Sequence, residues 1–284
     1  MDKKTEVLIT AESAADIPVR LKEYYGIETI PFYIKTDKGI FTDFEEIRGG
    51  NLIEYIELNG SYPEIIPPTA DEFSAFFSAR LSRAESIVHI SSGGEWSAAY
   101  RNAVEAAINM DKVYIVDSGQ LSSGIALGAI NAAKMAQSGF SARVIKTESE
   151  AYFSGVENTV MAGNEKYVRH SGIMPGFLCS LCDTFHLKSA FKVSKGAFTG
   201  NRNYLEGVES CMEQYVRHTL KNSREIDAGT LIITSSGCTY GEIQRLKELV
   251  EKRIHFENIY TVDYSCTLGW IFGRGSYGLV FGSK

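Results

Sequence analysis

Short apolar runs alternate with longer amphipathic segments through the first half of the chain. The runs Val7–Thr10, Ser86–Ile90 and Lys112–Asp117 are rich in Val and Ile, as buried strands are. Segments of helical periodicity follow the last two runs, at about Trp96–Asn109 and from the Ser118–Gly124 loop to Ser138. This alternation of strands and helices predicts a parallel sheet covered by helices on both faces.

Turn and capping residues bound further elements in the same half. Asp16 is expected to cap a short helix that has Pro18 in its first turn and ends at Gly26. The other predicted elements are a strand at Ile27–Lys35, a hairpin turn at Asp37–Gly39, a helix at Asn51–Leu58, a helix opened by a capping box at Thr69–Glu72, and a helix at Ser141–Phe153.

The pattern changes near residue 155. The second half is expected to hold strands at Asn158–Ala162, His186–Ser194, Thr230–Thr234 and Asn258–Val262, helices at Glu165–His170, Phe177–Cys182, Asn203–Lys221 (the longest) and Gly241–Arg253, and a glycine-rich end at Gly269–Gly278. We therefore predict an α/β protein of two α/β lobes, residues 1–155 with a parallel sheet and residues 156–284.

Composition narrows the classes of partner and the compartment. The 284 residues are 44% hydrophobic and 23% charged, with a net charge of −6, which disfavours binding to nucleic acid or to an anionic membrane. No apolar run approaches the ~20 residues of a membrane span, and the start shows no signal-peptide pattern. Five scattered cysteines fit a reducing compartment, so a cytoplasmic protein is expected.

Candidate chemistry concentrates in one loop, Ser91-Ser92-Gly93-Gly94, which follows a predicted strand and precedes a predicted helix. Small residues at such a junction let a ligand reach backbone N–H groups, and the helix dipole favours an anion there. The alternative is a tight turn with a helix cap. Similar hydroxyl-bearing loops contain Ser13, Ser118 and Ser122-Ser123. Together they favour binding of an amphipathic or apolar molecule with an acid head group.

The sequence contains little that indicates a catalytic or cofactor-binding motif. Gly273–Gly278 has the spacing of a dinucleotide-binding loop, but too little chain follows it for the helix and strand that such a site needs. No cofactor is predicted. His89 lies two residues before Ser91, hence on the same face of a strand. A phosphotransferase or hydrolase that acts through Ser91 and His89 is therefore the alternative from another functional class.

Several motifs occur in the order found in one known family. Ala11–Pro18 is similar to T-D-S-[ST]-A-D-L-P, and Ile90–Gly93 with Ser97 and Tyr100 is similar to I-S-S-G-L-S-G-T-Y with two residues inserted. Val116–Ser118 matches V-I-D-S, and Gly269–Phe281 has the spacing of G-x-H-x-G-P-G-x-x-G-L-x-F. Across nearly its whole length the chain resembles the DegV family of bacterial fatty-acid-binding proteins.

This resemblance implies a fold, a ligand and a set of site residues. It implies two α/β lobes with a fatty acid in a tunnel between them, and a non-catalytic carrier that in some members presents the acyl chain to a separate kinase. The residues expected to bind the head group are Ser91, Ser92, Gly93, Ser97, Arg169 and Arg274. The residues expected to line the site are Ser13, Ile65, Thr69, Ser118 and Ile271.

Three positions depart from the family pattern. Ile65 stands where the family has a threonine, Ile173 where some members have an arginine, and Ile271 where the family has a histidine. Each donor lost from a buried carboxylate costs about 1–3 kcal/mol. Arg274 and Thr69 are candidate replacements. A divergent member that binds another acid or a neutral apolar ligand therefore remains an open alternative.

Overall fold

The computed structural model describes residues 5–94, 97–205 and 210–284, and the chain divides into two compact units. Unit 1 contains the chain up to Ile47, Pro63–Ser154 and Lys195–Ala197. Unit 2 contains Arg48–Tyr62, Gly155–Ser194 and Phe198–Lys284. The expected division into 1–155 and 156–284 stays a prediction about domains, and the segments 48–62 and 195–197 group with the unit on the other side of that line.

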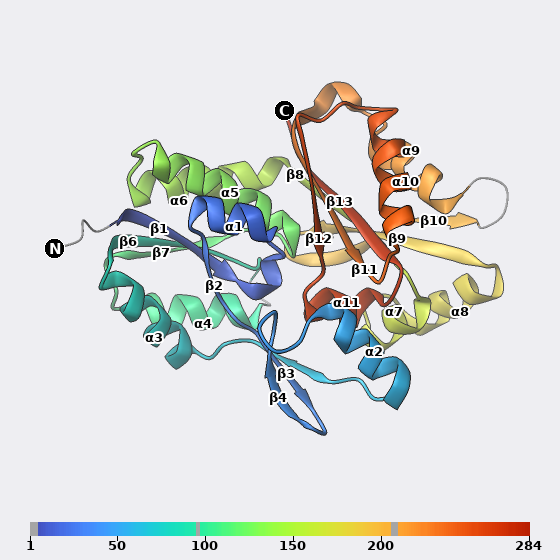
Figure 1. Ribbon diagram of the computed structural model, residues 1–284, viewed down its shortest axis with the longest axis horizontal. Helices are drawn as coiled ribbons and strands as arrows, with labels where there is room; N and C mark the ends of the chain where they lie inside the picture. The colour runs from blue at the N-terminus through green and yellow to red at the C-terminus, as the bar shows by residue number, and fades with distance from the viewer. Residues whose placement is uncertain (1–4, 95–96, 206–209) are drawn as a thin grey trace. The chain divides into compact units, whose positions relative to one another are not determined.

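Unit 1 is built on a four-stranded parallel sheet in the order β2-β1-β6-β7 (Figure 1). Helices α3 and α4 pack on one face, and α5 and α6 pack on the other, with α1 against α5. Its strands are β1 (Thr5–Glu12), β2 (Glu28–Ile30), β6 (Ala84–Ser91) and β7 (Val113–Asp117). Its helices are η1 (Ser13–Ala15), α1 (Val19–Tyr25), α3 (Ala70–Leu81), α4 (Ala98–Ala107), α5 (Ser123–Gln137) and α6 (Ala142–Tyr152), after which η2 (Phe153–Gly155) leads to unit 2. The predicted parallel sheet, covered on both faces, is confirmed.

A small antiparallel sheet completes unit 1. Its strands are β3 (Tyr33–Thr36), β4 (Gly39–Thr42) and β5 (Glu64–Ile66), in the order β4-β3-β5. The hairpin between β3 and β4 is confirmed, but the single strand expected at Ile27–Lys35 is wrong. It splits into β2 and β3, because Pro31 has no N–H to donate to a ladder and the N–H of Phe32 bonds Ser13 Oγ instead.

Unit 2 is built on a six-stranded mixed sheet in the order β10-β9-β8-β13-β11-β12. Its strands are β8 (Val156–Met161), β9 (Leu187–Ser194), β10 (Ala197–Leu205), β11 (Ile226–Ser236), β12 (Asn258–Asp263) and β13 (Ser276–Ser283). Its helices are α2 (Gly49–Asn59), α7 (Glu165–Ser171), α8 (Gly176–Thr184), α9 (Cys211–Thr219), η3 (Ser223–Glu225), α10 (Tyr240–Glu251) and α11 (Cys266–Phe272).

Three local predictions are wrong. Asp16 does not cap α1: it has left-handed backbone (φ +50°) and its carboxylate accepts a hydrogen bond from Ser122, while Pro18 holds the N-cap position. The helix expected at 203–221 begins only at Cys211, after its N-cap Ser210, and Asn203–Leu205 belong to strand β10 of the sheet. Residues 206–209 of that prediction lie outside the described residues. This helix was also expected to be the longest, but α9 has 9 residues and α5 has 15. The glycine-rich end, for which the sequence predicts no element, contains α11 and the interior strand β13.

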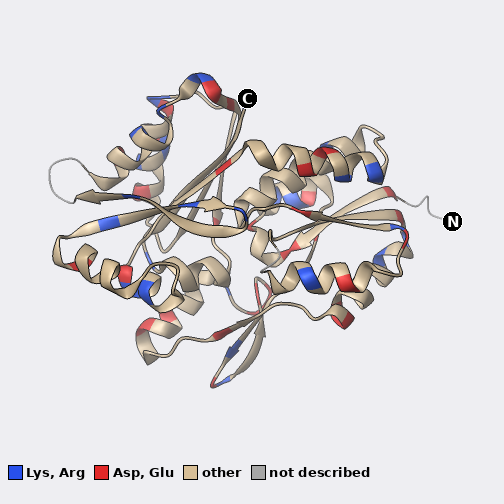
Figure 2. Cartoon of the chain, turned by 180° about the vertical axis from the view of Figure 1, so that it is seen from behind, with Lys and Arg blue, Asp and Glu red and all other residues tan. Residues whose placement is uncertain are grey.

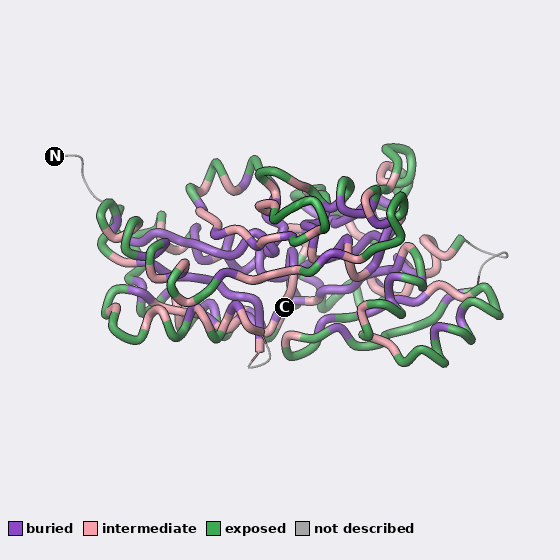
Figure 3. The backbone as a smooth tube through the Cα atoms, turned by 90° about the horizontal axis from the view of Figure 1, so that it is seen from below, coloured by how far each residue is buried: buried purple, intermediate pink, exposed green. Residues whose placement is uncertain are grey.

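Each unit is stabilised by its own core of buried side chains. In unit 1, Phe73 and Phe77 of α3 pack against Ile87 of β6. In unit 2, Tyr215 of α9 packs with Leu231 and Leu279 from neighbouring strands. Strands β1, β6 and β13 are mostly buried, whereas β10 and β12 are mostly exposed or half-buried. Figure 3 colours the backbone by this burial. Figure 2 shows basic and acidic residues interspersed along the elements. Among the described residues, every helix is too short or too polar to span a bilayer.

Candidate ligand-binding site

The carboxyl ends of β1 and β6 lie side by side at the centre of the parallel sheet of unit 1. From β1 the chain moves outward to β2 on one side, and from β6 it moves outward to β7 on the other side. The strand order therefore reverses between β1 and β6. Parallel α/β sheets bind ligands at such switch points, beyond the carboxyl ends of the strands. The candidate loop that follows β6 leaves the sheet at this point.

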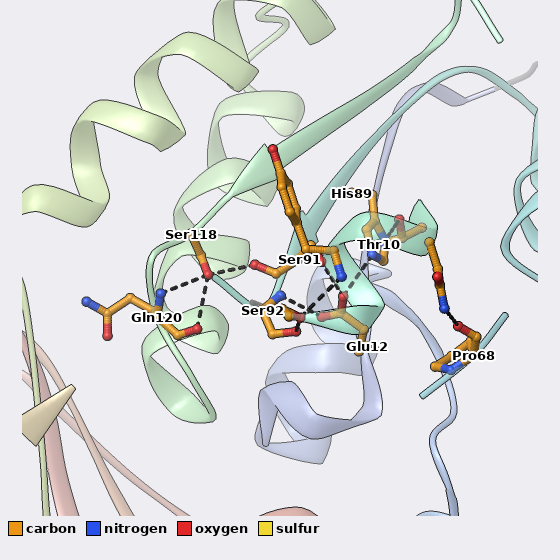
Figure 4. Close-up of polar contacts among 11 residues, drawn as sticks. Thr10, Glu12, Pro68, His89, Ser91, Ser92, Ser118 and Gln120 are labelled. Atoms are coloured by element: carbon orange, nitrogen blue, oxygen red, sulfur yellow. Dashed lines mark hydrogen bonds and ion pairs between the residues drawn. The ribbon is translucent and has the colours of Figure 1, made fainter. Parts of the chain in front are cut away.

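A buried carboxylate, which sequence analysis missed, organises this end of the sheet. Glu12 is the last residue of β1 and is 0% exposed. Its Oε1 accepts a hydrogen bond from Ser91 Oγ at 2.5 Å, and its Oε2 accepts one from the N–H of Ser92 at 3.0 Å (Figure 4). Because Ala11 pairs with Ile90 in the ladder, the next residues, Glu12 and Ser91, are brought together. Glu12 thus holds the first two residues of the loop.

His89 lies beneath Glu12 in the same polar group. As expected from strand alternation it faces the same way as Ser91: both contact Glu12, His89 through Nε2 at 3.4 Å. Its Nδ1 lies 2.9 Å from Thr10 Oγ1, and the rings of Phe73 and Phe77 contact its ring edge-on at 5.3 Å. Both ring nitrogens are therefore engaged by groups other than Ser91, and the Ser91 hydroxyl donates to a carboxylate rather than to an imidazole.

Two hydroxyls at the start of α4 form the most suitable head-group contact. Ser97 is the N-cap of α4 and accepts a hydrogen bond from the N–H of Tyr100 at 3.2 Å. Its Oγ also lies 3.0 Å from Ser92 Oγ. One of the two hydroxyls donates its hydrogen to the other, and the second hydroxyl keeps its own hydrogen free to donate. Among the described residues, no further acceptor for that hydrogen is found. The Ser92–Ser97 pair can therefore donate a hydrogen bond to a ligand at a helix N-terminus.

Gly93 fixes the shape of the loop. Its N–H donates to the carbonyl oxygen of Gln120 at 2.9 Å, and a Cβ atom at Gly93 would lie 2.2 Å from Cα of Gly119. The neighbouring Gly94 N–H donates to Asp117 Oδ1, as does the N–H of Gly119. The loops after β6 and β7 therefore touch through backbone, and only glycine fits at position 93.

The remaining predicted residues of unit 1 have structural contacts of their own. Ser13 donates to Asp43 Oδ2 at 2.7 Å, and Ser118 Oγ donates to the carbonyl of Ser91 at 2.6 Å, which braces the loop from behind. Thr69 forms the predicted capping box at the start of α3. Ile65 is half-buried in β5, paired with Ile34. These hydrogen bonds of the Ser13, Thr69 and Ser118 hydroxyls do not include Ser92 or Ser97.

The predicted residues of unit 2 lie on helices α7 and α11 and the turn after α11. Arg169 pairs with Asp183 at 2.7 Å, and Arg274 pairs with both carboxylate oxygens of Glu57 at 3.0–3.2 Å. Both guanidinium groups therefore have carboxylate partners within unit 2. Ile271 is half-buried on α11.

Unit 2 also holds an aromatic cluster that sequence analysis missed. Tyr62 stacks on His170 with ring centroids 3.6 Å apart and touches Tyr167 and Trp270 edge-on. The Tyr167 hydroxyl is buried without a hydrogen-bond partner among the described residues, and burial raises the pKa of Tyr167 to about 12. A Cβ atom at Gly273 would lie 2.6 Å from the Tyr167 ring, so a larger residue at position 273 would clash with the ring. The phenol therefore stays protonated and can donate.

The family model, the related sequences and the solved structures that are similar to this chain all point to one family. Residues 6–284 match the family described as "Uncharacterised protein, DegV family". A DegV domain-containing protein of Clostridium acetobutylicum is 21% identical over 290 residues, which cover 98% of this chain and 99% of that protein. One of Clostridium perfringens is 22% identical over 162 residues, so the chain spans only 57% of that relative. The solved structure of a fatty-acid-binding DegV family protein from Thermus thermophilus has a TM-score of 0.86 at 18% identity, over 98% of this chain and 100% of that one.

Proposed function

This chain belongs to the DegV family, and we propose that it binds a fatty acid or a related amphipathic lipid and does not transform it. The observation that carries the proposal is the Ser92–Ser97 hydroxyl pair at the switch point of the parallel sheet. It offers a polar head group one hydroxyl hydrogen and the N-terminus of α4. The fatty-acid binding of the structurally similar Thermus thermophilus protein supports the same ligand class.

The contacts of Ser91 and His89 do not form the Ser–His pair of the enzymatic alternative. The Ser91 hydroxyl donates to Glu12, while the His89 ring nitrogens contact Thr10 and Glu12. All three of the residues Glu12, His89 and Ser91 are 0% exposed, so a substrate does not reach the Ser91 hydroxyl in this arrangement. We propose that these residues position the loop. The odd number and scattered positions of the cysteines in the sequence support a proposed cytoplasmic location, as predicted. Presentation of the acyl chain to a separate kinase stays a prediction from the resemblance.

A neutral head group is the second candidate, and the buried Glu12 favours it. Its carboxylate already takes the Ser91 hydroxyl and the Ser92 N–H, which are donors that a ligand carboxylate would need. A second negative charge nearby would also be repelled in this buried setting. Comparing a fatty acid with the fatty alcohol of equal chain length separates the two candidates, because only the head group differs.

The first test is the mass of what co-purifies with the recombinant protein. Native and denaturing mass spectrometry should show about one lipid per chain, since a carrier holds its ligand through purification. A fatty acid supports the first candidate and a neutral lipid the second. Protein that is empty, and that takes up neither a fatty acid nor the matched alcohol, would contradict the proposed function.

Removing the hydroxyl of Ser92 should weaken lipid binding. In Ser92→Ala the affinity for the fatty acid should fall ~10-fold, because a hydrogen bond to a charged group contributes about 1.5–3 kcal/mol. Titration with a fluorescent fatty acid measures this loss. Ser138→Ala is the matched control, since its hydroxyl is exposed at the end of α5 and bonds only the Lys134 carbonyl. Equal affinities in the two variants would exclude Ser92 from the site.

A further inference from the structure

Unit 2 contains a groove whose lining residues are separate from the aromatic cluster. Its volume is about 280 Å³, and it is lined by residues of β8, β9, β10, β11 and β13 and by the segment from the C-terminal end of α9 to η3. We call it the Tyr204 groove. Polar atoms make up most of its exposed lining, whereas a lipid tail needs an apolar wall. Its ligand must therefore differ from the lipid proposed for unit 1.

Among the described residues that line the groove, Tyr204 has an unpartnered and buried hydroxyl. Tyr204 is 2% exposed, and its Oη has no hydrogen-bond partner among the described residues. Its ring is held in place by stacking on His218, with centroids 5.6 Å apart, and by an edge contact with Tyr215. Burial raises the pKa of Tyr204, so the phenol keeps its proton and is a donor at neutral pH. Buried hydroxyls normally have a partner, and this one lacks an acceptor.

The rim of the groove carries an excess of positive charge, although the whole chain is acidic. Lys192, Arg202 and Lys221 line it, against the carboxylates of Glu157 and Glu225. Glu157 is within 3.7 Å of Lys192, and Glu225 accepts a hydrogen bond from Asn222. Within residues 5–94, 97–205 and 210–284, no carboxylate forms an ion pair with Arg202 or Lys221.

Arg202 is also held in position. Its Nη1 lies 3.1 Å from Nε2 of His218. A guanidinium can only donate hydrogen bonds, so this ring nitrogen accepts, and the remaining N–H groups of Arg202 stay available on the rim. A fixed guanidinium beside a buried phenol donor is a combination that suits the oxygen atoms of a phosphate or carboxylate group.

We propose that the Tyr204 groove binds a small oxyanion, a phosphate or carboxylate group, through Tyr204 Oη and Arg202 with Lys221 on the rim. This site is independent of the lipid site, so either proposal can fail without the other. The groove volume admits a free ion or a small organic molecule that carries the group.

The test is a calorimetric titration of the whole chain with inorganic phosphate in a buffer without other oxyanions. Binding should saturate at one ion per chain. Arg202→Gln should weaken it ~10-fold and Tyr204→Phe ~5-fold, as expected for the loss of a charged and of a neutral hydrogen bond. Both replacements keep most of the side chain, and a thermal melt of each variant checks folding. Arg143→Gln and Tyr24→Phe, exposed in unit 1, are the matched controls.

Further arms identify the source of the anion. Tighter binding of glycerol phosphate than of inorganic phosphate indicates an organic phosphate, the reverse indicates the free ion, and tighter binding of citrate than of either indicates a carboxylate. Three results would overturn the proposal: no saturable binding of any of these anions, equal binding by the two groove variants and their controls, or a crystal grown with phosphate in which only water contacts Tyr204 Oη.

Discussion

Replacing Glu12 by alanine is expected to lower the free energy of unfolding by about 3 kcal/mol. Removing one partner of a buried hydrogen-bonded group typically costs that much, because the remaining polar groups are left buried and unsatisfied. The change leaves the hydroxyl of Ser91 and the N–H of Ser92 without an acceptor in a site from which water is excluded. It also removes the contact to His89. Urea denaturation followed by circular dichroism measures the loss.

Two further variants make this result specific. Glu12→Gln keeps the shape and one acceptor, so its loss should be clearly smaller than that of Glu12→Ala. Glu85→Ala on the neighbouring strand β6 removes an exposed carboxylate and should change stability by no more than about 0.5 kcal/mol. If Glu12→Ala unfolds at the same urea concentration as Glu85→Ala, the buried carboxylate does not hold the loop.

Replacing Gly93 by alanine should also cost several kcal/mol of stability and should abolish lipid binding. A new Cβ atom would stand 2.2 Å from Cα and 2.3 Å from the nitrogen of Gly119, and backbone cannot move aside as a flexible side chain can. The loop after β6 would have to shift, which displaces Ser92 from Ser97. Overpacking in a tight site costs about 1–3 kcal/mol or more, so a lower melting temperature is expected.

Gly50→Ala is the control for this substitution. Gly50 lies in the first turn of α2, and a Cβ atom there meets nothing within 4 Å. Alanine is preferred over glycine in a helix, so Gly50→Ala should leave stability unchanged or raise it slightly. If Gly93→Ala melts like Gly50→Ala and still binds lipid, the loop is not held by the close approach of Gly119.

Local signals predicted the elements that local chemistry determines. The capping box of Thr69 and Glu72 opens α3 as expected, and the apolar run before Ser91 forms the strand β6. Elements whose state depends on distant partners were missed. Ser276–Ser283 becomes an interior strand only because β8 and β11 lie on its two sides, and no local pattern in a glycine-rich end announces those neighbours.

The residues of the candidate site also fall into those with a local sequence signal and those that depend on distant contacts. Ser91, Ser92 and Gly93 were proposed from the sequence because small hydroxyl-bearing residues follow a strand and precede a helix there. Glu12 was not, since its partners are close to it only through the pairing of β1 with β6. One signal was present: Thr10 and Glu12 alternate with apolar residues at the end of a buried strand, which places two polar groups where apolar ones are expected. Arg169 and Arg274 were proposed as donors to a ligand, and their pairing with Asp183 and Glu57 depends on contacts that sequence cannot supply.

The path of the chain between the units affects the order of folding during synthesis. Helix α2 is made early, yet it belongs to unit 2 and packs against α11, where Gly49 approaches the carbonyl oxygens of Tyr264 and Ser265. Its buried side chains Leu52 and Ile53 therefore lack this partner until α11 has left the ribosome. Unit 2 cannot complete its fold before then, and the apolar face of α2 stays open to chaperones during this interval.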